Sequence, residues 1–169
     1  MKKNINKKGF TLIELLLVIA IIAILAAVIF VILDPLTRFR DARDSVRRED
    51  AFNINEAIKL HQIDNGGIYD TNISDLENDR VYMITGDDTT SGCDNFNQYC
   101  DTDVPYDDYC VDLQFLETAG YIGAIPINPG GETNWSDSIT GYTLEISTTS
   151  AITIRSCESE NTDEIYTIW

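Results

Sequence analysis

The sequence contains one long apolar segment near its start, KKGFTLIELLLVIAIIAILAAVIFVIL, which occupies residues 7–33. Between Phe10 and Leu33 the only charged side chain is that of Glu14. These 24 residues would form a helix of about 36 Å, which is enough to cross a hydrocarbon core of about 30 Å with some tilt. The segment therefore predicts one membrane-spanning helix.

Glu14 is the residue of this segment that needs an explanation. A carboxylate costs about 2.5–3.5 kcal/mol at the bilayer centre and less near the interface. A cut between Gly9 and Phe10 would create an α-amino group one helical turn from Glu14, in the same chain or in a neighbouring subunit. In an apolar surround such a pair would define the axial register between subunits, because a shift by one turn leaves both charges unpaired. The alternative is a carboxylate that simply reaches the membrane interface.

The residues from Lys8 to Glu14 resemble the class III signal of type IV pilins and type II secretion pseudopilins. The resemblance implies that a membrane prepilin peptidase cuts after Gly9 and N-methylates the new terminus, Phe10. It also implies that Glu14 pairs with the terminal amine of an adjacent subunit during assembly. An ordinary secretory signal fits less well, because its apolar region has about 7–15 residues and ends at a small-x-small cleavage site.

Charge predicts the orientation in the membrane. The leader carries Lys2, Lys3, Lys7 and Lys8 without any acid, so it is expected to stay in the cytoplasm. The arginines that follow the apolar segment are interleaved with acids and do not reverse this preference. We therefore expect a single pass through the cytoplasmic membrane with the head outside, followed by transfer to a cell-surface filament or a periplasmic pseudopilus.

Four parts are predicted along the chain. They are a prepilin leader (1–9), a transmembrane or filament-core helix (10–33), an amphipathic stalk helix (34–65) and a globular head (66–169). Pro35 removes a backbone donor and clashes with the carbonyl four residues earlier, so a kink is expected there, in one helix that runs from Phe10 to Asp64.

The stalk is predicted from apolar residues that recur at every third or fourth position, with charges elsewhere. These residues are Phe39, Ala42, Val46, Ile54, Ala57, Ile58 and His61. Asp50 interrupts the apolar face. His61 is the only histidine of the chain, and its place on this face indicates a packed residue. Asn65, Gly66 and Gly67 are expected to end the helix, because glycine suits a left-handed C-terminal position.

The head is predicted to be of the α+β class, and the resemblance implies the pilin fold, in which a long N-terminal helix packs against a small antiparallel sheet. Strands are expected at residues 81–84, 142–147, 151–155 and 164–168, with a helix at 107–118 and a short helical turn at 74–77. The segments 113–116, 120–122, 125–129 and 141–144 follow the order of many pilin heads. That order implies a helix, a proline-punctuated loop, and a hairpin whose tyrosine packs inward.

Four cysteines lie in the part that would be exported: Cys93, Cys100, Cys110 and Cys157. An even count in an oxidising compartment favours disulfides, and four cysteines allow three pairings. Cys93 and Cys100 flank a short polar loop, so their pairing is expected, which leaves Cys110 for Cys157. The spacings do not match the paired C-x₂-C arrangement of zinc sites.

Calcium is the cofactor that has to be weighed, because some members of the resembled family bind it in a head loop. Five aspartates that could supply oxygen ligands crowd one segment: Asp101, Asp103, Asp107, Asp108 and Asp112. However, Pro105 and Tyr106 stand where an EF-hand loop needs a ligand and a glycine. An acidic surface loop without a cofactor is the favoured interpretation, with calcium as the alternative.

The charge balance argues against binding of nucleic acid. The chain has a formal net charge of −16, and removal of the four leader lysines leaves −20. Residues 51–169 contain 22 acids against three basic side chains. Such a surface repels nucleic acid and anionic lipid at long range. No Ser/His/Asp set, phosphate loop or histidine cluster suggests an enzyme.

The sequence therefore predicts a structural subunit of a type IV pilus-like filament. Its expected partners are other pilins, the prepilin peptidase that also methylates, an inner-membrane assembly platform, and the membrane before assembly. Two alternatives stay open. One is a pseudopilin of a type II secretion system that drives exoprotein export, and the other is a membrane-anchored binding module that does not polymerise.

Overall fold

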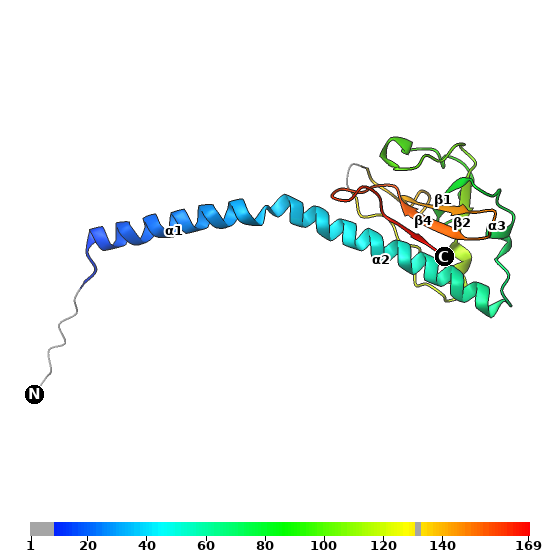
Figure 1. Ribbon diagram of the computed structural model, residues 1–169, viewed down its shortest axis with the longest axis horizontal. Helices are drawn as coiled ribbons and strands as arrows, with labels where there is room; N and C mark the ends of the chain where they lie inside the picture. The colour runs from blue at the N-terminus through cyan, green and yellow to red at the C-terminus, as the bar shows by residue number, and fades with distance from the viewer. Residues whose placement is uncertain (1–8, 131–132) are drawn as a thin grey trace, which may run out of the picture. The chain divides into compact units, whose positions relative to one another are not determined.

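The computed structural model describes residues 9–130 and 133–169 and contains a long helical region followed by an α+β head. Figure 1 shows the order of the elements along the chain. The helices are α1 (Leu12–Leu33), α2 (Pro35–Asp64), α3 (Thr71–Ser74), the 3₁₀ turn η1 (Asn97–Tyr99) and α4 (Gln114–Thr118). The strands are β1 (Val81–Thr85), β2 (Cys110–Asp112), β3 (Tyr142–Ile146), β4 (Ile152–Ser156) and β5 (Tyr166–Ile168).

The helical region is interrupted at Asp34. This residue has a left-handed backbone with φ of 31°, and Pro35 begins α2. Proline suits the first position of a helix, because the N–H that it lacks has no partner there. The side chain of Thr37 donates a hydrogen bond of 2.7 Å to the Asp34 carboxylate. The interruption expected at Pro35 is thus present and lies one residue earlier, whereas the predicted start of the helix at Phe10 is wrong, because α1 begins at Leu12.

The five strands form one sheet in the order β2-β1-β3-β4-β5. The pairs β1–β3, β3–β4 and β4–β5 are antiparallel, as the sequence predicts, whereas β1 and β2 are parallel. The expected helix at 107–118 is wrong in its first half. Residues 110–112 pair with 83–85 as β2, and only Gln114–Thr118 is helical. Pairing with a strand distant in sequence outweighs local helix propensity here.

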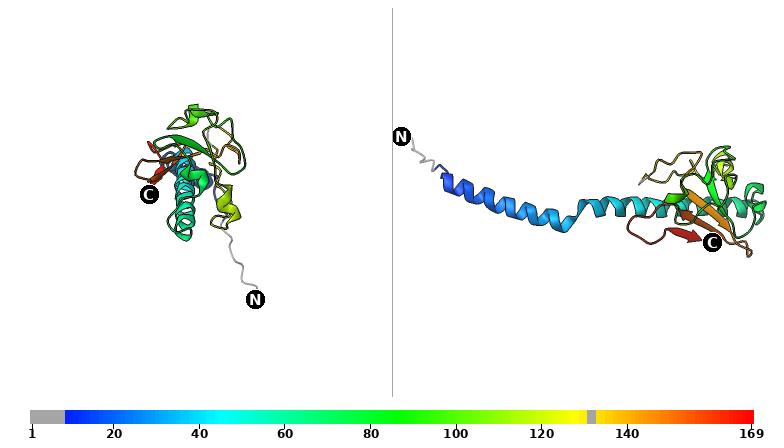
Figure 2. Two further views of the ribbon diagram at one scale, coloured as in Figure 1. Left: turned by 90° about the vertical axis from the view of Figure 1, so that its right-hand side faces the viewer. Right: turned by 90° about the horizontal axis from the view of Figure 1, so that it is seen from above.

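The main core lies between α2 and one face of the sheet (Figures 1 and 2). From α2 it receives Ala51, Ile54, Ala57 and Ile58. The last three belong to the predicted apolar face, whereas Ala42 and Val46 of that face are exposed. Alternate residues of β3 and β4 face them, among them Tyr142, Leu144, Ile152 and Ile154. Tyr142 is fully buried, which confirms the inward tyrosine that the family resemblance implies.

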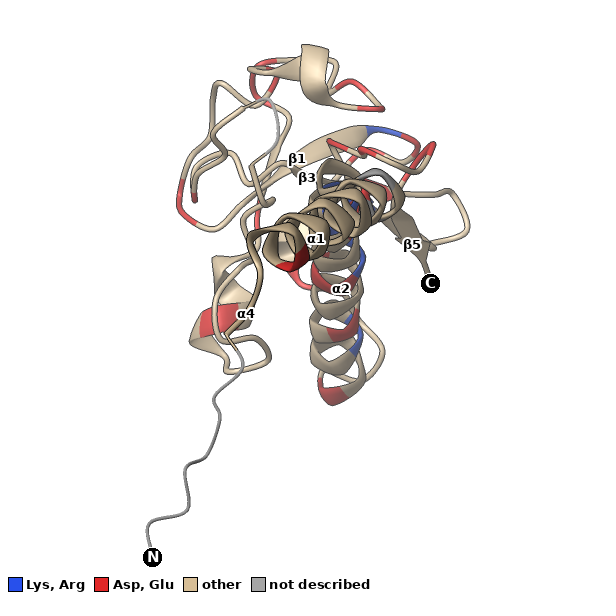
Figure 3. Cartoon of the chain, turned by 90° about the vertical axis from the view of Figure 1, so that its left-hand side faces the viewer, with Lys and Arg blue, Asp and Glu red and all other residues tan. Residues whose placement is uncertain are grey.

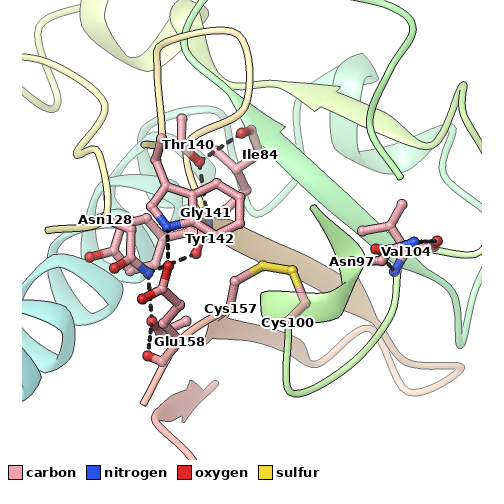
Figure 4. The surroundings of a disulfide bond; sticks show 12 residues. Ile84, Asn97, Cys100, Val104, Asn128, Thr140, Gly141, Tyr142, Cys157 and Glu158 are labelled. Atoms are coloured by element: carbon pink, nitrogen blue, oxygen red, sulfur yellow. Dashed lines mark hydrogen bonds between the residues drawn. A yellow bond between two sulfur atoms is a disulfide. The ribbon is translucent and has the colours of Figure 1, made fainter. Parts of the chain in front are cut away.

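A second core cluster is built around the segment between β1 and β2. It contains Met83, Cys93, Val104, Trp135 and Cys157. Two disulfides anchor the segment, and they join Cys93 to Cys110 and Cys100 to Cys157. Figure 4 shows the second of these bonds.

The predicted pairing of Cys93 with Cys100 and of Cys110 with Cys157 is therefore wrong. The segment turns back on itself, so that the backbone N–H of Cys93 donates to the carbonyl of Asp107 at 2.9 Å. The N–H of Asp101 donates to the carbonyl of Cys157, also at 2.9 Å. These contacts bring each cysteine to a partner that is distant in sequence.

Candidate functional site

Thr11 and Glu14 form a reciprocal cap at the start of α1. The backbone N–H and the hydroxyl of Thr11 donate to Oε2 of Glu14 at 2.9 and 2.8 Å, and the N–H of Glu14 donates back to the hydroxyl at 3.3 Å. This is the capping box of helix N-termini, where a carboxylate is also favoured by the helix dipole. Glu14 thus has a partner in its own chain, Thr11, that was not predicted from the sequence.

The predicted cleavage junction lies just outside this cap. Gly9 and Phe10 precede the first helical residue, Leu12, and are not part of any helix or strand. Phe10 is 82% exposed, and a Cβ placed on Gly9 would meet nothing within 4 Å. The peptide bond between Gly9 and Phe10 is therefore accessible. Cleavage, methylation and the intersubunit pairing of Glu14 stay predictions.

The helix that follows the junction exposes apolar side chains on all its sides. The stretch Leu12–Asp64 includes a window long and apolar enough to cross a membrane, and none of that window is buried within the chain. A helix that is apolar all round needs an apolar environment, which is either lipid or other helices. This segment can therefore serve as a membrane anchor and as a packing element between subunits.

A buried arginine joins the stalk helix to the head. Arg47 of α2 is 0% exposed, and its guanidinium donates to Asn128 Oδ1 at 2.9 Å, to Asp44 Oδ1 at 2.8 Å and to the Pro129 carbonyl at 3.0 Å. It also donates to Glu160 Oε1 at 2.9 Å and to Glu158 Oε2 at 3.4 Å.

Asp44 completes this network from one turn earlier in α2. Its carboxylate accepts hydrogen bonds from the backbone N–H of Glu160 and of Asn161, the latter at 2.8 Å. Arg43 forms a two-bond ion pair with Glu160. This pairing, supported by Arg47, lowers the pKa of Glu160 to about 2.

This network was not predicted from the sequence, although one signal was present. Arg47 lies four and seven residues before Ala51 and Ile54, so helical spacing places it on their buried face. A charge at such a position requires partners, because a buried unpaired charge is strongly unfavourable. Asp44 lies in α2 itself, but the other partners come from segments more than 80 residues later and could not be identified from α2 alone.

Three of the five aspartates weighed as calcium ligands accept separate hydrogen bonds from different parts of the head. Asp101 accepts from the Ser159 hydroxyl at 3.2 Å, Asp107 from the N–H of Gly92 at 2.7 Å, and Asp112 from the N–H of Gln114 at 2.7 Å. Within residues 9–130 and 133–169, no group of three or more acidic, histidine or cysteine side chains is placed to hold a metal ion. Calcium binding stays untested.

His61 and Asp50 lie on the covered side of α2. The ring of His61 contacts those of Phe115 and Tyr121 edge to face, with centroids 5.0 and 5.2 Å away, so it is a packed residue as predicted. Asp50 interrupts the apolar face but accepts a hydrogen bond of 2.7 Å from the hydroxyl of Tyr142. That bond accounts for a carboxylate at the edge of the core.

The protein belongs to the class in which an exposed apolar N-terminal helix is followed by an α+β head. The prokaryotic N-terminal methylation motif matches residues 4–30. The type IV wide pilus major component PilA4 of Thermus thermophilus is 52% identical over 63 residues, which are 36% of this chain. The chain spans 44% of the length of that relative. No solved structure matches this chain. The chain thus has the signature segment and the fold of the type IV pilin and pseudopilin family.

Proposed function

We propose that this protein is a structural subunit of a type IV pilus-like filament. The capped Glu14, at the accessible start of an all-apolar helix, carries this proposal. Prepilin peptidase would remove residues 1–9 and methylate Phe10, while the apolar helix holds the chain in the cytoplasmic membrane with its head outside. An assembly platform would then transfer the helix from lipid to a bundle of identical helices.

The geometry of the cap supports a role for Glu14 in register. Both Thr11 bonds end on Oε2, and within the described residues no hydrogen bond reaches Oε1. A second oxygen is therefore available for the amine of an incoming subunit. Since the cap holds the carboxylate at the first turn of α1, the intersubunit pair would form at a defined height.

The test is a comparison of the native chain with Glu14→Gln in the cell. Glutamine keeps the size of the side chain but removes the charge that would attract the amine. We expect both proteins to be cleaved before Phe10, as read by mass spectrometry of the N-terminal peptide, and only the native chain to form filaments. A mature chain that still begins at Met1, or filaments of Glu14→Gln at native yield, would disprove the proposal.

Two alternative functions, a secretion pseudopilin and an anchored module that does not polymerise, can be distinguished from a pilus subunit by gene deletion and by Glu14→Gln. A secretion pseudopilin would leave exoproteins inside the cell when its gene is deleted, whereas a pilus subunit would leave secretion intact and remove surface filaments. A non-polymerising anchored module would tolerate Glu14→Gln. The similarity to a wide pilus component favours the filament.

A further inference from the structure

Helix α2 has two flanks of different character on either side of the face that the head covers. In Figure 3, α4 lies on one side of α2 and β5 on the other. Residues that are two positions apart on a helix point about 200° apart, so Arg48 and Asp50 lie on opposite flanks. Asn55 and Lys59 lie on the same side of the helix as Arg48. Asn55 contacts Thr167 in β5, and Lys59 contacts the ring of Trp169, which follows β5.

The flank next to α4 contains a groove of about 440 Å³. Its lining includes Asp50, Asn53, Leu60, Ile122 and Pro126. Asp50 is half-buried there, and this burial raises the pKa of its carboxyl group despite the hydrogen bond from Tyr142. Within the described ranges no lysine or arginine pairs with Asp50. The groove thus combines a mainly apolar lining with two carboxylates: Asp50, which lacks a cation, and Glu56, which lies 4.0 Å from Lys59.

The opposite flank presents a cation that lacks an acid. Arg48 is exposed and, among the residues that the structure describes, forms no ion pair or hydrogen bond. In the same part of the chain Arg38 is the other basic side chain without an acidic partner. One turn after Arg48 on the same flank, Phe52 is 56% exposed.

We propose that a second copy of this chain docks here, with Arg48 of one copy paired to Asp50 of the next. Phe52 of the first copy then lies on the apolar lining near Ile122 and Pro126 of the second. Each copy uses both flanks at once, so the contact is head-to-tail, which is the kind of contact that can repeat along an open helical filament. This inference rests on the proposed filament function and names a lateral contact that supports it.

The partial burial of Asp50 reduces the desolvation cost of this pairing. Asp50 is already partly removed from water in the single chain, so part of its desolvation cost is present before docking. A guanidinium that arrives in the groove gains a close carboxylate in a medium of reduced polarity. The adjacent aromatic side chain adds apolar burial, which is the arrangement found at the centre of strong interfaces.

The direct test is a cross-link between two different copies. Arg48→Cys and Asn53→Cys full-length chains are expressed together, since Asn53 is exposed and lines the groove without a hydrogen bond in the described chain. We expect disulfide-linked dimers in isolated filaments when both variants are present, and none with either alone. The control pair is Arg80→Cys with Asn53→Cys, because Arg80 is an exposed head residue outside both flanks. Filaments of native yield without the specific dimer would overturn the contact.

A charge reversal separates this contact from the filament function itself. Arg48→Glu should lower filament yield by about tenfold, while the amount of mature subunit in the membrane stays native. Arg80→Glu, an equal change of charge elsewhere, should keep native yield. If Arg48→Glu assembles normally while Glu14→Gln does not, the lateral contact is wrong and the filament function stands. If Glu14→Gln also assembles, the filament function fails.

Discussion

Arg47 and Asn128 are joined by a buried hydrogen bond of 2.9 Å, although 81 positions separate them in the chain. Asn128 also donates to the Gly141 carbonyl at 3.0 Å and to the Ser156 hydroxyl at 2.7 Å. One amide therefore connects α2 to the residues around β3 and β4; Figure 4 shows part of this arrangement. The network orients the head on the stalk helix through polar contacts as well as apolar ones.

Replacement of Arg47 by methionine should destabilise the head strongly. It leaves Asp44 and Glu158 buried without their cation, and loss of one partner from a buried ionic network costs about 3–5 kcal/mol. The measurement is denaturant unfolding of the full-length protein in detergent, followed by near-UV circular dichroism. Arg48→Met is the matched control on the next residue, and about 0.5 kcal/mol or less is expected for it. Equal losses for both would show that the buried network contributes nothing.

Gly141→Ala should lower the stability of the head because the added methyl group would clash with Trp135, and Gly67→Ala serves as a control without such a clash. Gly141 has φ of +78°, and a Cβ there would lie 2.5 Å from the Trp135 ring. Gly67 has a similar φ of +89° with nothing within 4 Å. Gly67→Ala should therefore cost only the left-handed backbone term of about 1–2 kcal/mol. Gly141→Ala should add about 1–3 kcal/mol for overpacking. Equal melting temperatures for the two variants would contradict this difference.

The stability that Glu160 contributes should depend on pH in the acid range. Its pKa is lowered from 4.5 to about 2 by the hydrogen bonds and charges of Arg43 and Arg47. A lowered pKa in the folded state stabilises the fold above pH 4.5, and this gain is lost as pH falls towards about 2. The free energy of unfolding should therefore be higher for the native chain than for Glu160→Gln at neutral pH. A difference that stays constant from pH 7 to about pH 2 would refute this assignment.

The two disulfides should differ in their contribution to stability. Cys100–Cys157 spans 57 positions and Cys93–Cys110 spans 17. In the chain-entropy model the longer loop contributes about 1 kcal/mol more. Urea unfolding of the double serine variants at each pair measures this difference, and peptide mapping of the native protein checks the connectivity. A peptide that contains Cys93 linked to Cys100 would contradict the structure.

The head shows where sequence patterns suffice and where they do not. The strand at 142–147 was predicted nearly to its ends, because apolar residues (Tyr142, Leu144 and Ile146) alternate with polar ones in the sequence, although in the structure Thr143 is buried as well. Residues 110–112 carry no such signal and are a strand only because they pair with β1. Arg47 was left unassigned, since its partners, such as Glu160, come from a distant loop.

The order of amino acids alone accounts for the N-terminal segment of this protein, up to Leu33. An uninterrupted apolar run, one acid and a basic leader depend on composition and helical spacing, which are local properties. The pairing of Cys100 with Cys157 and the burial of Arg47 depend on which segments meet in space. Those contacts are selected by packing and by the need to satisfy buried polar groups, so they emerge only when the sheet, the stalk helix and the loops are assembled together.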